Sequence, residues 1–121
     1  MIYLSERPAP RRAGKYGNRK AVSPDGKVFD SRHECNRYCE LMLMQRAGVI
    51  SGLECQKRYE LIPTQRVDGK VVEKACTYIA DFVYQRDGKT VVEDAKGCKT
   101  EVYRIKRKLM LHVHGIRIVE V

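Results

Sequence analysis

The chain has 121 residues, a length that suits one domain with a modest core. Its 24 Lys and Arg residues outnumber its 15 Asp and Glu residues, which gives a formal net charge of +9. This charge favours a polyanionic partner, with nucleic acid ahead of an acidic membrane, although it could serve solubility alone. No apolar run approaches the ~18 residues of a membrane span, and no apolar leader opens the chain. We therefore expect a soluble, cytoplasmic protein without membrane contact.

The five cysteines do not form a recognisable framework. Their number is odd and no Cys-x-x-Cys pair occurs, which argues against a disulfide scaffold and a zinc ribbon. Cys35 and Cys39 could meet a metal on one helix face, but free cysteines are more often small buried residues. His112 and His114 are two residues apart and would point in different directions on a helix. We expect no zinc site.

Residues 1–26 are predicted to form a basic, flexible N-terminal arm. The segment contains three prolines, three glycines and six Lys or Arg residues, and it lacks apolar periodicity. Such an arm can follow a phosphate backbone, or it can be a frayed tail without a role. A single domain is then expected over residues 27–121.

The domain is predicted to begin with a short strand over residues 27–30, after a Pro-Asp-Gly turn. Ser31 has the position of an N-cap, and Glu34 completes capping-box spacing. The helix that follows is expected to run to about Ala47, with Gly48 as its C-cap.

Three strands are predicted next, over residues 53–61, within 71–84 and over 90–96. Asp-Gly turns at 67–70 and 86–89 are typical of hairpins. On the first of these strands, alternation places one set of side chains on one side: Leu53, Cys55, Lys57, Tyr59 and Leu61.

A basic helix is predicted from about residue 100 to 113, ended by Gly115. One of its faces is apolar and consists of Val102, Ile105, Leu109 and Val113. A final strand over 116–121 completes the order strand-helix-strand-strand-strand-helix-strand. This order predicts an α/β or α+β fold, with a central mixed sheet flanked by helices.

The strand over residues 90–96 reads TVVEDAK. Valines on both faces are typical of a central, buried strand. Because side chains alternate, Asp94 and Lys96 share one face and Glu93 takes the other. A carboxylate two residues from a lysine suits metal-assisted hydrolysis, since the carboxylate can hold a divalent cation and the ammonium can serve the attacking water.

Asp81 is a second candidate metal ligand. It lies inside the apolar stretch 78–84, where a carboxylate is costly unless it is paired or bound to a metal. The turn at Gly88 is expected to bring its strand beside that of Asp94. An isolated strand aspartate is more often an edge or bulge residue, but two carboxylates and Lys96 on paired strands indicate a metal site.

Glu34 is a third candidate. On the first helix it aligns with Tyr38 and Leu41, at i+4 and i+7, so it faces at least partly toward the protein. The alternative is that it only pairs with Ser31 in the capping box. Both roles can hold, because a glutamate in the first turn can point off the helix end.

This arrangement resembles the PD-(D/E)XK nuclease superfamily: Asp81, then Asp94-Ala95-Lys96 thirteen residues later, with Glu34 on an earlier helix. Four segments are also similar to a family of small phage and prophage proteins placed in that superfamily: FDSRHE at 29–34, AGVI at 47–50, YIADFVY at 78–84 and VEDAKG at 92–97. The resemblance spans about residues 15–121. The sequence departs from the motif's name at Ala80, which stands in the proline position. The adjacent Glu93 leaves the register ambiguous, but strand alternation and the family pattern both select Asp94.

The resemblance implies a restriction-endonuclease-like core that hydrolyses DNA phosphodiester bonds with Mg²⁺, or with Mn²⁺ as a substitute. It implies metal ligands at Asp81, Asp94 and the Ala95 carbonyl. Lys96 would serve the water, and Glu34 would support a metal or its water. Similar nucleases include Holliday-junction resolvases, replication-fork nucleases, transposition endonucleases and restriction enzymes. Branched DNA is one candidate substrate, and a phage-encoded enzyme would act in the host cytoplasm.

DNA contacts are expected near this site. A glutamine near Gln56 approaches the site in related nucleases, although an exposed strand residue is the plainer interpretation. Lys99, Tyr103 and Lys106 could grip a phosphate beside the scissile one, or form a solvated basic face. The small size favours a homodimer. Two alternatives remain: a non-catalytic nucleic-acid-binding protein, which explains the charge but not the buried-looking carboxylates, and a structural phage component.

Overall fold

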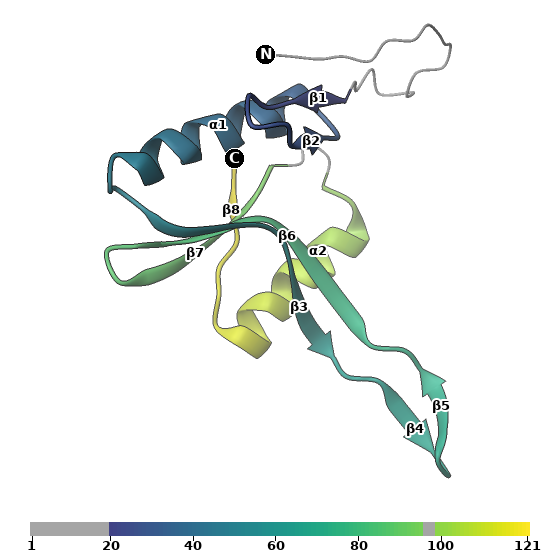
Figure 1. Ribbon diagram of the computed structural model, residues 1–121. Coiled ribbons are helices and arrows are strands. Elements are labelled where there is room, and N and C mark those ends of the chain that lie inside the picture. Colours follow the sequence, from purple (N-terminus) through teal and green to yellow (C-terminus); the bar gives the residue numbers. More distant parts are fainter. Residues whose placement is uncertain (1–19, 96–98) are drawn as a thin grey trace, which may run out of the picture. The chain divides into compact units, whose positions relative to one another are not determined.

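The computed structural model describes residues 20–95 and 99–121, and the chain divides into two units, residues 1–50 and 51–121. Figure 1 shows the elements of each unit. Within the predicted arm, strand β1 (Ala21–Val22) pairs antiparallel with β2 (Val28–Phe29). The charged residues of positions 1–19 lie outside the described residues.

A hydrogen-bonded turn organises the N-terminal unit between its two short strands. The backbone N–H of Ser23 donates to the Lys27 carbonyl over 2.9 Å. Asp25 accepts hydrogen bonds from the Ser23 hydroxyl and, over 2.6 Å, from the Tyr38 hydroxyl, and these bonds hold the pKa of Asp25 below its ordinary value. The Tyr38 ring lies 5.0 Å from that of Phe29. Tyr38 therefore ties helix α1 (Arg32–Arg46) to the turn.

Both ends of α1 follow from local signals. The Ser31 hydroxyl accepts a hydrogen bond from the Glu34 N–H over 3.1 Å, which confirms the predicted N-cap. At the other end, Gly48 has a φ of +80° and donates to the Gln45 carbonyl over 3.0 Å, while the Val49 N–H reaches the Met44 carbonyl. A glycine adopts this left-handed conformation without a Cβ clash and so satisfies the last carbonyls of the helix.

The C-terminal unit is built on a four-stranded sheet in the order β3-β6-β7-β8. The first three strands are antiparallel neighbours and β8 runs parallel to β7, so the sheet is mixed. With the two helices, this confirms the predicted α+β class. The strand bounds are β3 Ser51–Ile62, β6 Cys76–Arg86, β7 Lys89–Asp94 and β8 Val119–Glu120.

A separate two-stranded hairpin, β4 (Gln65–Val67) and β5 (Lys70–Glu73), extends from the ends of β3 and β6 (Figure 1). The stretch predicted as extended over 71–84 is therefore interrupted between β5 and β6. The Asp-Gly turns occur as predicted, and Asp87 has a φ of +52° with Gly88 at +76°. Two successive positive φ angles match the twist of a hairpin, which explains why Asp-Gly is favoured there.

Helix α2 (Glu101–Leu109) continues into a π-helical turn, η1 (Met110–His114), and Gly115 ends it with a φ of +69°. The predicted apolar face is wrong, because Val102 and Ile105 are 61% and 55% exposed. Of that face only Leu109 packs against the core of the sheet, together with Tyr103, while Met110 is fully buried in it. The other buried members of this core are Leu61, Tyr78, Ala80, Val83, Val92 and Ile118.

The apolar face was predicted wrongly because α2 carries two stripes of side chains that could face the core. The stripe that packs on the sheet includes Tyr103, Lys106 and Met110, at i, i+3 and i+7. Because it contains a lysine, this stripe looks polar in the sequence. Long side chains such as tyrosine and lysine can cover apolar surface with their stems while their polar tips reach solvent.

In the described part of the chain, no helix is long and apolar enough to cross a membrane.

We expect Met110→Ala to lower the free energy of unfolding by about 2–5 kcal/mol, because it empties a fully buried site. Leu111→Ala is the matched control, since Leu111 is 54% exposed on the same turn and should cost no more than about 0.5 kcal/mol. Urea unfolding of both variants measures the difference. Equal destabilisation would contradict this assignment of the buried face.

Candidate functional site

Two buried aspartates lie at the centre of the four-stranded sheet. Strands β6 and β7 pair with Phe82 opposite Glu93, and continuing this register by one residue places Asp81 across from Asp94. Both aspartates are 2% exposed. Asp81 Oδ2 accepts a hydrogen bond of 2.7 Å from the backbone N–H of Ala95, the residue that follows β7. The structure therefore brings together the two carboxylates that the sequence singled out.

Strand β3 reaches the same carboxylate from the other side. Continuing its register with β6 sets Gln56 opposite Asp81, and the Gln56 Nε2 atom donates to Asp81 Oδ1 over 3.3 Å. Gln56 has a φ of +56°, which is uncommon for a residue other than glycine. Such a conformation persists where its surroundings hold it, and it often occurs at functional sites. Gln56 is exposed, as expected for a strand glutamine, yet its amide contacts the site.

Asp94 has its own donor. The Tyr78 hydroxyl, from β6, donates to Asp94 Oδ2 over 2.7 Å in a buried environment. Burial raises the pKa of Tyr78 well above its ordinary value, and the hydrogen bond to Asp94 raises it further. The phenol therefore stays protonated and serves as a donor. No sequence pattern selects Tyr78 as a partner of Asp94, because the contact joins positions 16 residues apart.

Glu93, next to Asp94 in the chain, has a different partner. It is 1% exposed, and the Tyr84 hydroxyl donates to its Oε2 atom. Glu93 and Asp94 therefore accept from different tyrosines of β6. The register that sets Asp94, rather than Glu93, opposite Asp81 is therefore the one that the structure adopts.

The two remaining candidate residues are not placed in this cluster. Glu34 belongs to the N-terminal unit, where it is buried in the first turn of α1. Lys96 lies outside the described residues. Within residues 20–95 and 99–121, no group of three or more His, Cys, Asp or Glu side chains could hold a metal ion.

The chemistry of the donor set nevertheless suits a hard divalent cation. The proposed ligands in the C-terminal unit are two carboxylates and a backbone carbonyl, and Mg²⁺ and Ca²⁺ prefer oxygen ligands of this kind. An ionised carboxylate offers about four lone-pair sites, so a hydrogen bond to one oxygen does not exclude coordination. The N–H and O–H donors would then orient the ligands.

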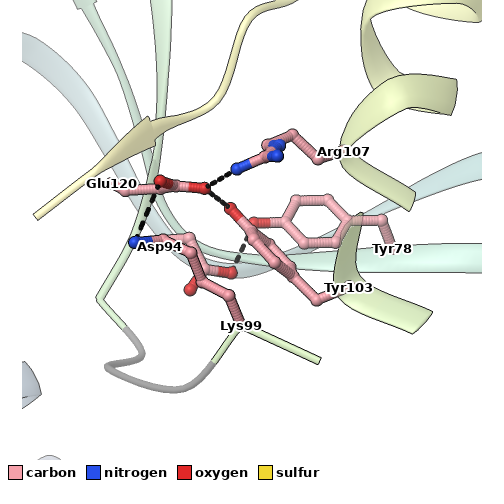
Figure 2. A network of polar contacts seen from close by, with 6 residues as sticks. All are labelled: Tyr78, Asp94, Lys99, Tyr103, Arg107 and Glu120. Carbon is pink, nitrogen blue, oxygen red and sulfur yellow. Dashed lines mark hydrogen bonds and ion pairs between the residues drawn. The ribbon is translucent and has the colours of Figure 1, made fainter. Parts of the chain in front are cut away.

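A second polar cluster lies beside Asp94 and centres on Glu120 of β8 (Figure 2). The Tyr103 hydroxyl and the Arg107 guanidinium both donate to Glu120 Oε2, over 2.7 and 2.8 Å. Lys99 Nζ lies 3.5 Å from Glu120 Oε1. These four residues are called the Glu120 network below. Lys106, the third predicted DNA contact, is half-buried on the same helix and is not among the residues that reach Glu120.

The charges of the Glu120 network support one another. Hydrogen bonds from Tyr103 and then Arg107 lower the pKa of Glu120. The pKa of Tyr103 is raised, first by burial, then by its hydrogen bond to Glu120 and by the charge of Asp94. The Tyr78 and Tyr103 rings are 6.4 Å apart, so the two clusters are neighbours. The sequence analysis missed Glu120, although it is the one acidic residue after Glu101 in a basic segment.

The fold and this site define an α+β protein with buried carboxylates on the central strands of a mixed sheet. A family model described as a protein of unknown function (DUF1064) matches residues 13–118, so the chain belongs to that family. No curated protein and no solved structure matches the chain.

We expect Tyr78→Phe to lower the free energy of unfolding by about 1.5–3 kcal/mol, because it removes a donor from a buried carboxylate. Tyr103→Phe is the control, since its partner Glu120 is partly solvated and the loss should be no more than about 1 kcal/mol. Denaturant unfolding of both variants tests this. A larger loss for Tyr103→Phe would contradict the ranking.

Proposed function

We propose that this chain is a metal-dependent DNA endonuclease of the PD-(D/E)XK type. The observation that carries the proposal is the pair of buried aspartates, Asp81 and Asp94, on adjacent central strands of a chain with a net charge of +9. The positive charge suits DNA as a partner. Buried carboxylates, in contrast, would repel a phosphate unless a cation lies between them. A metal-dependent reaction at DNA accounts for both features.

In this proposal Asp81, Asp94 and the Ala95 carbonyl hold the cation. When bound, a divalent cation polarises a phosphodiester and lowers the pKa of an attacking water. Gln56 and Tyr78 act through the ligands, because their hydrogen bonds fix the orientation of the Asp81 and Asp94 carboxylates. Burial excludes bulk water, which strengthens the electrostatic interactions at the site.

Two further roles rest on the sequence. If the strand alternation expected from the sequence continues to Lys96, this lysine would share a face with Asp94 and would orient the attacking water. Glu34, at the start of α1, would support a metal or its water. A homodimer remains a prediction from the chain's size.

The basic helix α2 supports DNA as the partner. It carries Arg104, Lys106, Arg107 and Lys108 against one acidic residue, Glu101. Such residues are typical phosphate contacts, and the resemblance to junction-cleaving nucleases makes branched DNA a candidate substrate.

The direct test is to incubate the full chain with linear duplex, single-stranded, flapped and four-way DNA. Each substrate is tested with Mg²⁺, with Mn²⁺ and with excess chelator. We expect cleavage only with a divalent cation. Binding without cleavage of any substrate would favour the alternative of a non-catalytic nucleic-acid-binding protein.

We expect Asp81→Asn and Asp94→Asn each to reduce cleavage on the order of 100-fold or more, because each removes a metal ligand. Asp87→Asn is the matched control. It makes the same chemical change at an exposed turn residue whose positive φ asparagine also adopts readily, so its cleavage rate should be near normal. Circular dichroism checks folding. Normal cleavage by a folded Asp81 or Asp94 variant would refute the proposed ligands.

We expect Glu34→Gln to lower the cleavage rate by orders of magnitude while costing at most about 1 kcal/mol of stability. The control is Glu40→Gln on the same helix, whose side chain is 63% exposed and pairs with Arg37 at 2.9 Å. Thermal melts and cleavage rates are measured on the same preparations. A lower melting temperature with near-normal cleavage would restrict Glu34 to its role at the helix start.

A further inference from the structure

Three donors of the Glu120 network converge on one carboxylate. Lys99 approaches Oε1, while Tyr103 and Arg107 both approach Oε2 (Figure 2). Tyr103 and Arg107 are four residues apart on α2, so they lie on one face of the helix, and Lys99 directly precedes its N-cap, Thr100. An ammonium, a guanidinium and a hydroxyl are also the groups that proteins use to bind phosphate oxygens.

We propose that Lys99, Tyr103 and Arg107 form a binding site for one backbone phosphate of DNA, and that Glu120 occupies this site as an internal competitor. The proposal rests on the proposed function for the identity of the ligand. Glu120 pairs with Asp94 in the parallel register of β8 and β7. A phosphate in place of the Glu120 carboxylate would therefore lie beside the candidate metal site.

The exposure of these side chains allows such an exchange. The side chains of Lys99, Arg107 and Glu120 are 44%, 37% and 28% exposed, so an outside phosphate can reach them without opening the core. Solvent-exposed ion pairs contribute only about 0–1 kcal/mol each, so the internal carboxylate is not held strongly. Replacing one anion by another also preserves the pairing of both cations.

A purely structural role makes a different prediction. If the Glu120 network only fastens β8 to α2, removing the Glu120 charge should lower stability and leave DNA affinity unchanged beyond the general effect of net charge. If Glu120 competes with phosphate, the same change should strengthen DNA binding, because it frees two cations and removes a like charge from the DNA interface.

The test compares Glu120→Gln with Glu101→Gln by titrating a fluorescein-labelled DNA duplex in Ca²⁺, which usually replaces Mg²⁺ with looser geometry. Both variants change the net charge equally, and each replaces a glutamate that pairs with an arginine of α2. Among the residues that the structure describes, Glu101 forms an ion pair only with Arg104, at 3.7 Å, and its side chain is 86% exposed. We expect Glu120→Gln to bind roughly tenfold more tightly than the unmodified chain, and Glu101→Gln less than about twofold more tightly.

A second pair of variants keeps the test decisive if Glu120→Gln does not fold. In the otherwise unmodified chain, Arg107→Ala should weaken DNA binding about fivefold, because it removes a phosphate donor, whereas Arg104→Ala on the same helix should weaken it about twofold. Under the structural role, Arg107 is already neutralised by Glu120, and the two losses should be equal.

The outcomes separate this inference from the proposed function. If the unmodified chain binds no DNA in any condition, the proposed function itself fails. If it binds DNA but Glu120→Gln and Glu101→Gln change affinity equally, only the phosphate site is overturned. If Glu120→Gln does not fold, equal losses for Arg107→Ala and Arg104→Ala overturn the phosphate site in the same way.

Discussion

The buried carboxylate of Asp81 must be hydrogen-bonded, and this requirement governs the contacts at the centre of the sheet in the C-terminal unit. Asp81 is 2% exposed inside an apolar strand, where an unpaired carboxylate would cost several kcal/mol. Its two oxygens accept from the Ala95 N–H, beyond the end of β7, and from the Gln56 amide on β3. One side chain on β6 thus links the strands on both sides of it. Gln56, which has a positive φ angle, lies directly opposite Asp81 in the pairing of β3 with β6.

The protein satisfies its buried and exposed carboxylates with different donors. Asp94 and Glu93 accept from the hydroxyls of Tyr78 and Tyr84, which are neutral donors. A neutral donor orients a carboxylate and leaves its negative charge available to a cation. Glu120, nearer to solvent, is bound by Arg107 and Lys99 as well as by a tyrosine. This difference agrees with the roles that we propose, which are metal binding for the buried group and exchange with phosphate for the exposed one.

Helix α2 connects these two arrangements. Met110 and Tyr103 set its rotation, because they pack on the core of the sheet. The tip of Tyr103 and its i+4 neighbour Arg107 then reach Glu120 on β8. Val102 and Ile105 are left exposed as a consequence. The same packing that stabilises the C-terminal unit therefore positions the donors that we propose for phosphate binding.

Local signals in the sequence determined the ends of α1 and the two Asp-Gly turns, because capping and turn geometry depend on a few adjacent residues. The order of the two helices and of β3, β6 and β7 was also predictable, whereas the short strands β1, β4 and β5 were not expected. The second of these turns also sets the antiparallel pairing that brings Asp81 and Asp94 together, so the proximity of these two aspartates could be predicted. The roles proposed for Glu34 and Lys96 rest on the sequence motif alone.

Only the tertiary structure decided which stripe of α2 is buried, since periodicity offered two and packing against the sheet selected the one that contains Lys106 and Met110. It also decided the partners of the carboxylates: Gln56 contacts a residue 25 positions away, and Tyr103 contacts one 17 positions away. Such contacts depend on strand register and helix rotation, which arise when distant segments bury their apolar surfaces together.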